Sequence, residues 1–317
     1  MKILITQKLP FDVENYLKGF EVAYNNTDKQ LSKKELIEKI SDVDGVITML
    51  SDQMDKEVLD AAKKLKVIAN YAVGYNNIDI GYAAERGIVV CNTPDVLTET
   101  TAELAVALLL AVSRKIVEAH NFVLEKKFKG WKPELFLGTD LYNKTAGIYG
   151  FGKIGQNIAR ILRGFNTEVV YNSRSRNIQA ELLTGAKYLD FETFLTVSDF
   201  IIISAPLNES TKHRFTIDEF KRMKGSAILI NIGRGPIVKE DDLCIALKNG
   251  MIKGCGLDVY EFEPEINKEL FKLKNTVLLP HIGSASVETR VKMATLCCDS
   301  IITVLKNDEI PKNVVNR

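Results

Sequence analysis

Short apolar runs, many of them β-branched, alternate with amphipathic segments along most of the chain. Nearly continuous apolar runs with helical segments between them are typical of strands buried on both faces, so the pattern predicts a parallel sheet. In the first part of the chain the predicted strands are 2–6, 22–24, 45–50, 67–71 and 88–91.

A second series of the same kind runs from 145 to 282. Between the two series, residues 100–120 are apolar all round for several turns, which predicts one long helix connecting two bodies. The last periodic segment, 286–305, is long enough to return to the first body. The strands predicted in the second series begin at 146, 168 and 187 and then occupy 200–205, 227–232, 254–259 and 276–279.

The predicted class is therefore α/β, with two Rossmann-like domains that each contain a parallel sheet. We expect a domain of residues 100–284 to be inserted into a discontinuous domain made of 1–99 and 285–317. A chain of 317 residues is long enough for two such cores, and it contains no repeat or low-complexity stretch.

A glycine-rich turn follows the first strand of the second series. Residues 150–155 read GFGKIG and open an amphipathic helix that ends near Arg163. Gly150 permits the tight turn, Gly152 lets the backbone approach a pyrophosphate, and Gly155 lets the helix lie close to the strand. The helix N-terminus adds amides and a positive dipole end. Because a second strand follows at the expected distance, the pattern predicts a dinucleotide site.

The end of that second strand indicates which dinucleotide binds. An acid there would accept hydrogen bonds from a ribose 2′-hydroxyl and repel a 2′-phosphate. This chain has NSRSR instead, in which Ser173, Arg174 and Ser175 can bind phosphate oxygens. We therefore expect NADP(H) as the preferred cofactor, with NAD(H) possible. The alternative is that Arg174 and Arg176 only lie on a solvated loop.

Charge and hydropathy exclude several classes of partner. The formal net charge is +1 and the basic residues are scattered, so we expect neither nucleic acid nor a membrane as a partner. The N-terminal apolar stretch is too short for a secretion signal, and the longest apolar run, 104–112, is too short to span a bilayer. We expect a cytoplasmic protein.

The five cysteines have no CxxC spacing and no histidine beside them. We therefore expect reduced structural thiols and no metal site. Cys255, in a predicted buried strand, is expected to be a small core residue.

Three polar segments follow predicted strands, where an open parallel sheet binds its ligands. Arg234, between two glycines, could clamp a carboxylate or make a routine surface salt bridge. Glu263 precedes a proline, and taken alone it could be a solvated loop acid. His281 directly follows a strand and could exchange a proton with a carbonyl oxygen near neutral pH. We expect the other histidines, His120 and His213, to be structural.

In this order the segments resemble the D-isomer-specific 2-hydroxyacid dehydrogenase family, and the resemblance covers essentially the whole chain. It extends to 70–79 (NYAVGYNNID), 92–105 (NTPDVLTETTAELA) and 205–211 (APLNEST). Within the family the chain is most similar to the glyoxylate and hydroxypyruvate reductases, by NYAVGYNNID, by GWKP at 130–133 and by SRSR after the second strand.

The resemblance implies NAD(P)H-dependent reduction of a small 2-oxo acid, glyoxylate or hydroxypyruvate, to the D-2-hydroxy acid. It implies a flavodoxin-like substrate domain and a Rossmann cofactor domain. His281 would donate the proton, and Glu263, favoured over Glu261 by the family spacing, would orient the imidazole. Arg234 and His281 would bind the substrate, with the backbone N–H groups of Val73 and Gly74 helping to hold its carboxylate.

The resemblance also implies a set of cofactor contacts and, because relatives are usually dimers through the cofactor domain, a homodimer. The residues expected at the cofactor are Gly150, Phe151, Gly152, Lys153, Ile154, Gly155, Ser173, Arg174, Ser175, Pro206, Ile232, Gly233, Arg234, Asp258, His281 and Gly283.

A few departures from the family pattern narrow the assignment. Gly233 stands where many relatives have alanine or serine, a small change that should preserve the turn before Arg234. The lack of a C-terminal regulatory extension disfavours the longer phosphoglycerate dehydrogenases, and the lack of a glutamine before Pro280 disfavours formate dehydrogenases. Two alternatives stay open: an NAD-dependent D-lactate or D-3-phosphoglycerate dehydrogenase, and a non-catalytic nucleotide-sensing protein like the family's corepressor branch.

Overall fold

The computed structural model describes all residues from 1 to 317. The chain forms two compact units, which are described separately. Unit 1 combines Met1–Leu97 with Ser284–Arg317, and unit 2 is Thr98–Gly283. The boundaries expected from the sequence, after residues 99 and 284, lie close to these.

Unit 1 contains a five-stranded parallel sheet in the order β2-β1-β3-β4-β5. This is the strand order of a flavodoxin-like doubly wound fold. All five strands predicted from the apolar runs are present. Their bounds are β1 Lys2–Ile5, β2 Glu21–Tyr24, β3 Gly45–Thr48, β4 Val67–Asn70 and β5 Val89–Cys91.

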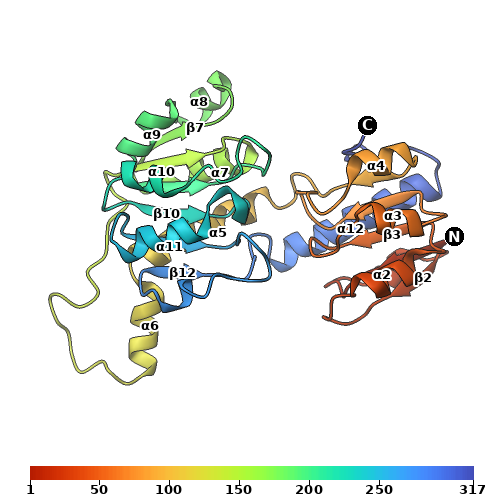
Figure 1. Ribbon diagram of the computed structural model, residues 1–317, viewed down its shortest axis with the longest axis horizontal. Coiled ribbons are helices and arrows are strands. Elements are labelled where there is room, and N and C mark those ends of the chain that lie inside the picture. Colours follow the sequence, from red (N-terminus) through yellow and green to blue (C-terminus); the bar gives the residue numbers. More distant parts are fainter. The chain divides into compact units, whose positions relative to one another are not determined.

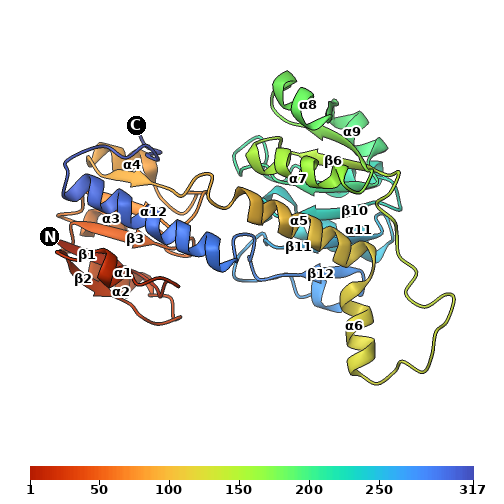
Figure 2. The same ribbon diagram turned by 180° about the vertical axis from the view of Figure 1, so that it is seen from behind.

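Helices cover both faces of the unit 1 sheet because its strands are apolar on both sides. Leu4, Val46 and Ile68 pack in one cluster with residues of α2 and α3, and on the other face α12 lies along β3 and β4 (Figure 2). The periodic segment predicted at 286–305 is α12, and the Ser286 side chain caps it by accepting from the Thr289 N–H at 3.2 Å. The helices are α1 Val13–Tyr16, α2 Lys33–Ile40, α3 Lys56–Ala61, α4 Ile80–Glu85 and α12 Val287–Leu305.

Unit 2 contains a seven-stranded parallel sheet in the order β12-β11-β10-β9-β6-β7-β8 (Figure 1). The order reverses at β6, which pairs with β7 on one side and β9 on the other. Such a switch point is where a doubly wound sheet binds its ligand. The bounds are β6 Thr145–Tyr149, β7 Glu168–Asn172, β8 Lys187–Tyr188, β9 Phe200–Ile203, β10 Ile228–Asn231, β11 Gly254–Leu257 and β12 Thr276–Leu278, so every strand predicted in the second series is confirmed.

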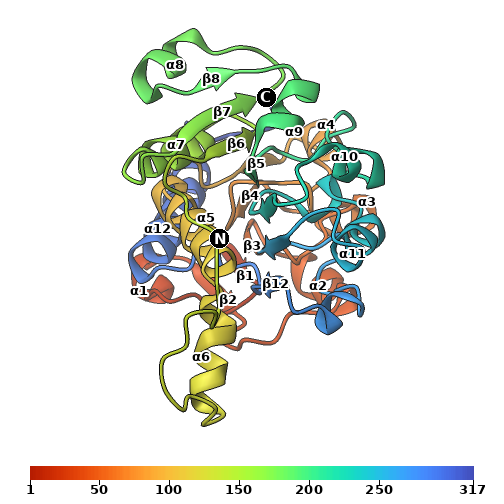
Figure 3. The same ribbon diagram turned by 90° about the vertical axis from the view of Figure 1, so that its left-hand side faces the viewer.

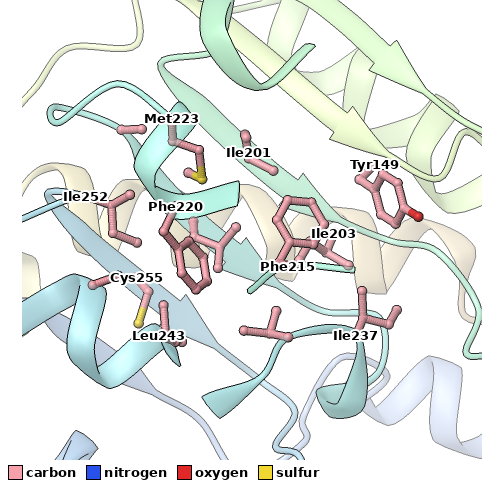
Figure 4. Packing of buried hydrophobic residues seen from close by; sticks show 14 of the residues in the cluster. Tyr149, Ile201, Ile203, Phe215, Phe220, Met223, Ile237, Leu243, Ile252 and Cys255 are labelled. Carbon is pink, nitrogen blue, oxygen red and sulfur yellow. The ribbon is translucent and has the colours of Figure 1, made fainter. Parts of the chain in front are cut away.

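Alternate residues of each strand in unit 2 face opposite layers of helices. Ile201 and Ile203 point toward α9, α10 and α11, where Phe215 and Phe220 lie over the strand (Figure 4). Ile202 packs with residues of α5 and α7, which lie side by side on the other face (Figure 3). The helices of unit 2 are α5 Thr98–Ser113, α6 Ile116–Leu124, α7 Lys153–Arg163, α8 Ile178–Thr184, α9 Phe191–Val197, α10 Ile217–Arg222 and α11 Glu240–Lys248, with short 3₁₀ turns η1 Gly235–Ile237 and η2 Leu270–Lys272.

The single helix predicted over 100–120 is wrong in one respect, because the structure has two helices there. Lys115 adopts a left-handed backbone with φ +53° between α5 and α6, which interrupts the α-helical hydrogen-bond ladder. Helix α5 packs its apolar residues against the unit 2 sheet. Helix α6 has no buried residue, and it projects from the sheet of unit 2 with the segment that follows it (Figures 1 and 3).

No helix of the structure combines the length and apolar character that crossing a bilayer requires. All five cysteines are free and buried. Cys255 lies in β11 within the core cluster of Figure 4, as expected for a core residue. The side chains form no group of three or more His, Cys, Asp or Glu residues that could hold a metal ion.

Candidate active site

The glycine-rich turn lies between β6 and α7 in unit 2, beside the switch point of the sheet. Gly150 has φ +92°, and a Cβ there would lie 2.6 Å from the backbone of Ala205. A Cβ at Gly155 would lie 2.4 Å from the Gly150 carbonyl oxygen. Both positions therefore require glycine for close backbone packing.

Gly152 has a different role, because a Cβ there would meet nothing within 4 Å. It is the N-cap of α7 and provides no side-chain cap. The N-terminus of α7 therefore faces open space, and its first amides have no capping side chain. This arrangement fits a pyrophosphate, since backbone amides and the helix dipole favour an anion at that end.

The two arginines after β7 differ in their surroundings. Arg176 is bound in an ion pair, with Nε 2.9 Å from Glu181 Oε1 and Nη2 2.8 Å from Oε2. Glu181 also accepts from the Tyr171 hydroxyl at 2.8 Å, and the hydrogen bonds from Arg176 and Tyr171 lower its pKa. Arg174 is exposed and takes no part in this pairing. The turn that contains Arg174 is held by a 2.8 Å hydrogen bond from Ser173 Oγ to the Ser175 carbonyl.

The segment after β10 fixes Arg234 through backbone contacts. Asn231 accepts from the Gly233 N–H at 3.1 Å and donates to the Arg234 carbonyl at 3.1 Å. Arg234 Nη1 donates to the Gly233 carbonyl at 2.7 Å. Burial lowers the pKa of the guanidinium, and the charge of Glu263 opposes that shift. Because arginine stays protonated, the site holds a partly buried cation with Glu263 as its nearby counter-charge.

Gly235 allows the segment that carries Arg234 to approach a second segment closely. A Cβ at this position would lie 1.7 Å from the Tyr260 carbonyl oxygen. The glycine therefore brings the Arg234 segment directly against the segment that carries Glu263.

His281 and Glu263 form a direct pair. His281 has φ +55°, and its Nδ1 lies 2.8 Å from Glu263 Oε2. The other oxygen, Oε1, accepts from the Tyr260 N–H at 2.9 Å. Burial acts to raise the pKa of Glu263, but the hydrogen bond and charge of His281, the Tyr260 N–H and Arg234 outweigh it and lower the pKa. Since Nδ1 is engaged, Nε2 is the ring nitrogen left for a substrate.

Asp258 holds the backbone that follows His281. Its Oδ1 accepts from the Ile282 N–H at 2.7 Å and its Oδ2 from the Gly283 N–H at 2.8 Å. Burial raises the pKa of Asp258, against these hydrogen bonds and the charge of His281. Both carboxylate oxygens of Asp258 therefore accept hydrogen bonds from backbone N–H groups. The contact of Asp258 with the cofactor stays a prediction.

A second histidine and glutamate pair lies beside the first. His213 Nε2 is 2.6 Å from Glu261 Oε1, so Glu261 is occupied by His213 while Glu263 is paired with His281. Glu261 Oε2 accepts from the Glu240 N–H at 2.9 Å, and Glu240 accepts from the N–H groups of Glu261 at 2.6 Å and Asn267 at 3.1 Å. Glu240 thus ties both ends of the segment that carries Glu263 to the start of α11. Sequence reasoning missed Glu240, Tyr260 and the role of Glu261, because no spacing pattern relates residues so far apart in the chain.

The other residues expected at the site are distributed between the units. Pro206 follows β9 in unit 2, and its carbonyl accepts from Thr211 Oγ1 at 2.8 Å. Ile232 is buried directly after β10. Val73 and Gly74 lie in unit 1, in the loop after β4.

Unit 2 therefore combines a pyrophosphate-type cradle with a partly buried arginine and an oriented histidine at the carboxyl ends of its strands. This combination defines a nicotinamide-dependent oxidoreductase of the doubly wound class.

Comparison with known proteins gives the family. Residues 106–283 match the family model described as D-isomer specific 2-hydroxyacid dehydrogenase, NAD binding domain. The chain belongs to the D-isomer-specific 2-hydroxyacid dehydrogenase family, as the motifs predicted, and it is an enzyme that uses a nicotinamide cofactor on small 2-oxo or 2-hydroxy acids.

Relatives of similar length cover the whole chain. The glyoxylate reductase of Thermococcus litoralis is 50% identical over all of this chain and 97% of its own length. Among solved structures, the TT0316 protein of Thermus thermophilus has a TM-score of 0.94 at 39% identity, covering 99% of this chain and 100% of that one. An NADPH-dependent glyoxylate/hydroxypyruvate reductase of Sinorhizobium meliloti, in complex with NADP and malonate, has a TM-score of 0.85 at 31% identity, covering 99% and 96%. These likenesses confirm the predicted fold.

Proposed function

We propose that the protein is an NADPH-dependent reductase that converts glyoxylate to its achiral 2-hydroxy acid or hydroxypyruvate to the D-2-hydroxy acid. The observation that carries the proposal is the 2.8 Å contact between His281 Nδ1 and Glu263 Oε2, beside the partly buried Arg234. A histidine held at Nδ1 by a carboxylate presents Nε2 in a fixed direction, as a proton donor to a carbonyl oxygen requires.

Each of the three residues has a separate task in this proposal. NADPH, when bound, supplies the hydride to the carbonyl carbon of the 2-oxo acid. His281 gives its Nε2 proton to the carbonyl oxygen, and Glu263 fixes the orientation of the ring for that transfer. Arg234 binds the substrate carboxylate through its planar guanidinium, together with the N–H groups of Val73 and Gly74. Positioning and charge complementarity then lower the barrier.

We propose that unit 2 holds the cofactor and unit 1 contributes to substrate binding. The cradle of residues 150–155 would bind the pyrophosphate at the start of α7. Ile232, Gly233 and Gly283 would lie at the nicotinamide with Asp258, and Pro206 would line the same site. Ser173, Arg174 and Ser175 would bind the adenosine ribose phosphate.

The preference for NADPH rests on the loop after β7. The strand ends in Asn172 rather than an acid, and Arg174 is exposed beside it. Glu181, an acid of the neighbouring helix, is neutralised by Arg176, so it would not repel a 2′-phosphate. An NADPH-dependent reductase among the similar structures supports the same choice.

The substrate assignment is supported by the relatives. Glyoxylate reductases of Thermococcus litoralis and Pyrococcus furiosus cover the whole chain at 50% and 47% identity. The similar Sinorhizobium meliloti enzyme is described as acting on glyoxylate and hydroxypyruvate.

We also propose a cytoplasmic homodimer, formed through α6 and the segment that follows it. Several large apolar side chains in this region are exposed in the single chain, which is unusual for a surface without a partner. They are Ile116, Val117, Val123, Leu124, Phe128, Trp131, Leu137 and Tyr142. Light scattering of the purified protein should give twice the mass of one chain, and a monomer at micromolar concentration would contradict this part of the proposal.

The reductase activity is tested by following oxidation of NADPH and of NADH with glyoxylate, hydroxypyruvate and pyruvate. We expect turnover of glyoxylate or hydroxypyruvate with a preference for NADPH. A preference for NADH would overturn the role given to Arg174. No oxidation with any of the three acids would overturn the reductase itself.

A further inference from the structure

Three consecutive carbonyl groups in the loop after β4 are turned into unit 1. The Ala72 carbonyl accepts from the Thr93 N–H at 2.8 Å. The Val73 carbonyl accepts from Asn92 Nδ2 at 2.8 Å, and the Gly74 carbonyl accepts from Asn70 Nδ2 at 2.9 Å. Every carbonyl from 72 to 74 is therefore fixed by a donor of the unit itself.

The peptide geometry then dictates where the next three amides point. In a planar trans peptide the N–H lies opposite the carbonyl of the preceding residue. The N–H groups of Val73, Gly74 and Tyr75 are therefore directed away from Thr93, Asn92 and Asn70. None of the three donates to another group of the unit, while Val73 and Gly74 are half-buried and Tyr75 is exposed. Polar backbone groups at such places pair with water or with a ligand.

The asparagine that holds Gly74 is itself fixed. Asn70 is fully buried at the end of β4, and its Oδ1 accepts from Thr48 Oγ1 at 3.0 Å and from Asn77 Nδ2 at 3.3 Å. Because Oδ1 accepts from two donors, the side-chain NH2 group of Asn70 is the part that faces the Gly74 carbonyl. Asn77 Nδ2 also donates to the carbonyls of Met49 and Asp52, at 3.1 Å and 3.0 Å.

Asn92 is fixed through its backbone. Its N–H donates to the Asn313 carbonyl at 3.2 Å, and its carbonyl accepts from Asn313 Nδ2 at 2.6 Å. Its side chain is left to hold the Val73 carbonyl. The loop is therefore oriented by two asparagines that are anchored independently of each other.

We propose that Asn70 and Asn92 are positioning residues that turn the N–H groups of Val73, Gly74 and Tyr75 outward as one row of donors for the carboxylate of the substrate. The inference rests on the proposed function and deepens it, because it adds the Tyr75 amide as a third donor and names the side chains that orient the row. A row of neutral donors selects a small carboxylate over a neutral carbonyl compound, since hydrogen bonds to a charged acceptor are the stronger ones.

The test compares Asn70→Ala and Asn92→Ala with Asn25→Ala as the matched control. Asn25 lies in the same unit and also donates from its side chain to two backbone carbonyls, those of Thr6 and Lys29. For each protein the KM and kcat for glyoxylate are measured, together with the Kd of NADPH by fluorescence and the Kd of oxalate, a non-reacting carboxylate, by calorimetry.

Loss of either positioning side chain should raise the KM for glyoxylate and the Kd of oxalate about tenfold, the size expected for one charge-assisted hydrogen bond. The Kd of NADPH should not change, and Asn25→Ala should behave as the wild type. If Asn70→Ala does not fold, Asn92→Ala decides, because its side chain holds only the Val73 carbonyl. An unchanged KM and oxalate Kd, or a loss confined to kcat, would overturn the proposal.

Failure of this inference can be told from failure of the proposed function. A wild-type protein that binds oxalate but oxidises neither NADPH nor NADH with any 2-oxo acid would overturn the function, while the oxalate measurements would still test the row of amides. A wild-type protein that reduces glyoxylate while the variants bind oxalate normally would overturn only the inference.

Discussion

At the scale of single residues, neighbouring side chains of the same type have different roles. Glu261 and Glu263 are two residues apart, yet one is paired with His213 and the other with His281. Arg174 is exposed while Arg176 is bound to Glu181. The family spacing already favoured Glu263 over Glu261, and the folded chain adds which partner each member of the two pairs contacts.

The Glu263 carboxyl should make stability depend on acid pH. Its pKa is lowered in the folded protein, although burial acts the other way. A carboxyl with a lowered folded-state pKa contributes stability above its unfolded pKa of about 4.3 and loses it as the pH falls through the folded value. The wild type should therefore lose more stability than Glu263→Gln between about pH 5 and pH 3, as measured by denaturant midpoints. Parallel pH profiles would show that the pairing with His281 contributes nothing.

The two arginines predict a difference in cofactor binding. Arg174→Ala should raise the KM for NADPH about tenfold and leave that for NADH unchanged, because the 2′-phosphate loses one charge-assisted contact. Arg176→Ala is the matched comparison and should have the smaller effect on NADPH, since Arg176 is bound to Glu181. A larger effect of Arg176→Ala would reverse the assignment.

At the scale of elements, the strands were easier to predict than the breaks between helices. Apolar runs identified the central strands because their residues are buried on both faces. The edge strands β2 and β8 are more exposed, and they were found from their place in the alternating series. The break between α5 and α6 gave no such signal, because it depends on one lysine in a left-handed conformation and not on a glycine or proline. The sequence also did not indicate which elements pack together. The contacts of Glu240, for example, join the start of α11 to a loop about twenty residues further along the chain.

Glu240 should therefore support the segment that carries Glu263 from outside that segment. Glu240→Ala removes the acceptor for the N–H groups of Glu261 and Asn267, which should cost about 1 to 3 kcal/mol of stability and lower kcat about tenfold. Denaturant unfolding and steady-state kinetics would measure both effects. Glu265→Ala, an exposed acid in the same segment, should change neither, and equal effects of the two substitutions would argue against a specific role of Glu240.

Two glycines of unit 2 should respond to alanine in opposite ways. Gly235→Ala places a Cβ against the Tyr260 carbonyl, which should cost about 3 kcal/mol and disturb Arg234. Gly152→Ala meets no atom of the protein, so folding should be unaffected while NADPH binds more weakly, because the new methyl group occupies the approach of the pyrophosphate. Unchanged NADPH binding in Gly152→Ala would contradict the cradle.

At the scale of the whole molecule, the sequence predicted two doubly wound sheets and a discontinuous first domain, and the structure has unit 1 made from both ends of the chain. This was predictable because each sheet is built from local βα repeats and the last helix follows the final strand of the second series. The candidate site residues, in contrast, lie far apart in the chain. Arg234, Glu263 and His281 follow β10, β11 and β12, which are neighbours in the sheet of unit 2, whereas Val73 and Gly74 belong to unit 1.

The central claim is that His281 donates the proton in a reduction carried out by this protein. The most direct test is the turnover of glyoxylate by His281→Gln at saturating NADPH, with the Kd of NADPH measured on the same sample. We predict a loss of kcat of about 100-fold or more with the Kd of NADPH unchanged, because general acid catalysis contributes that much. A His281→Gln protein that binds NADPH and turns over glyoxylate at the wild-type rate would contradict the account.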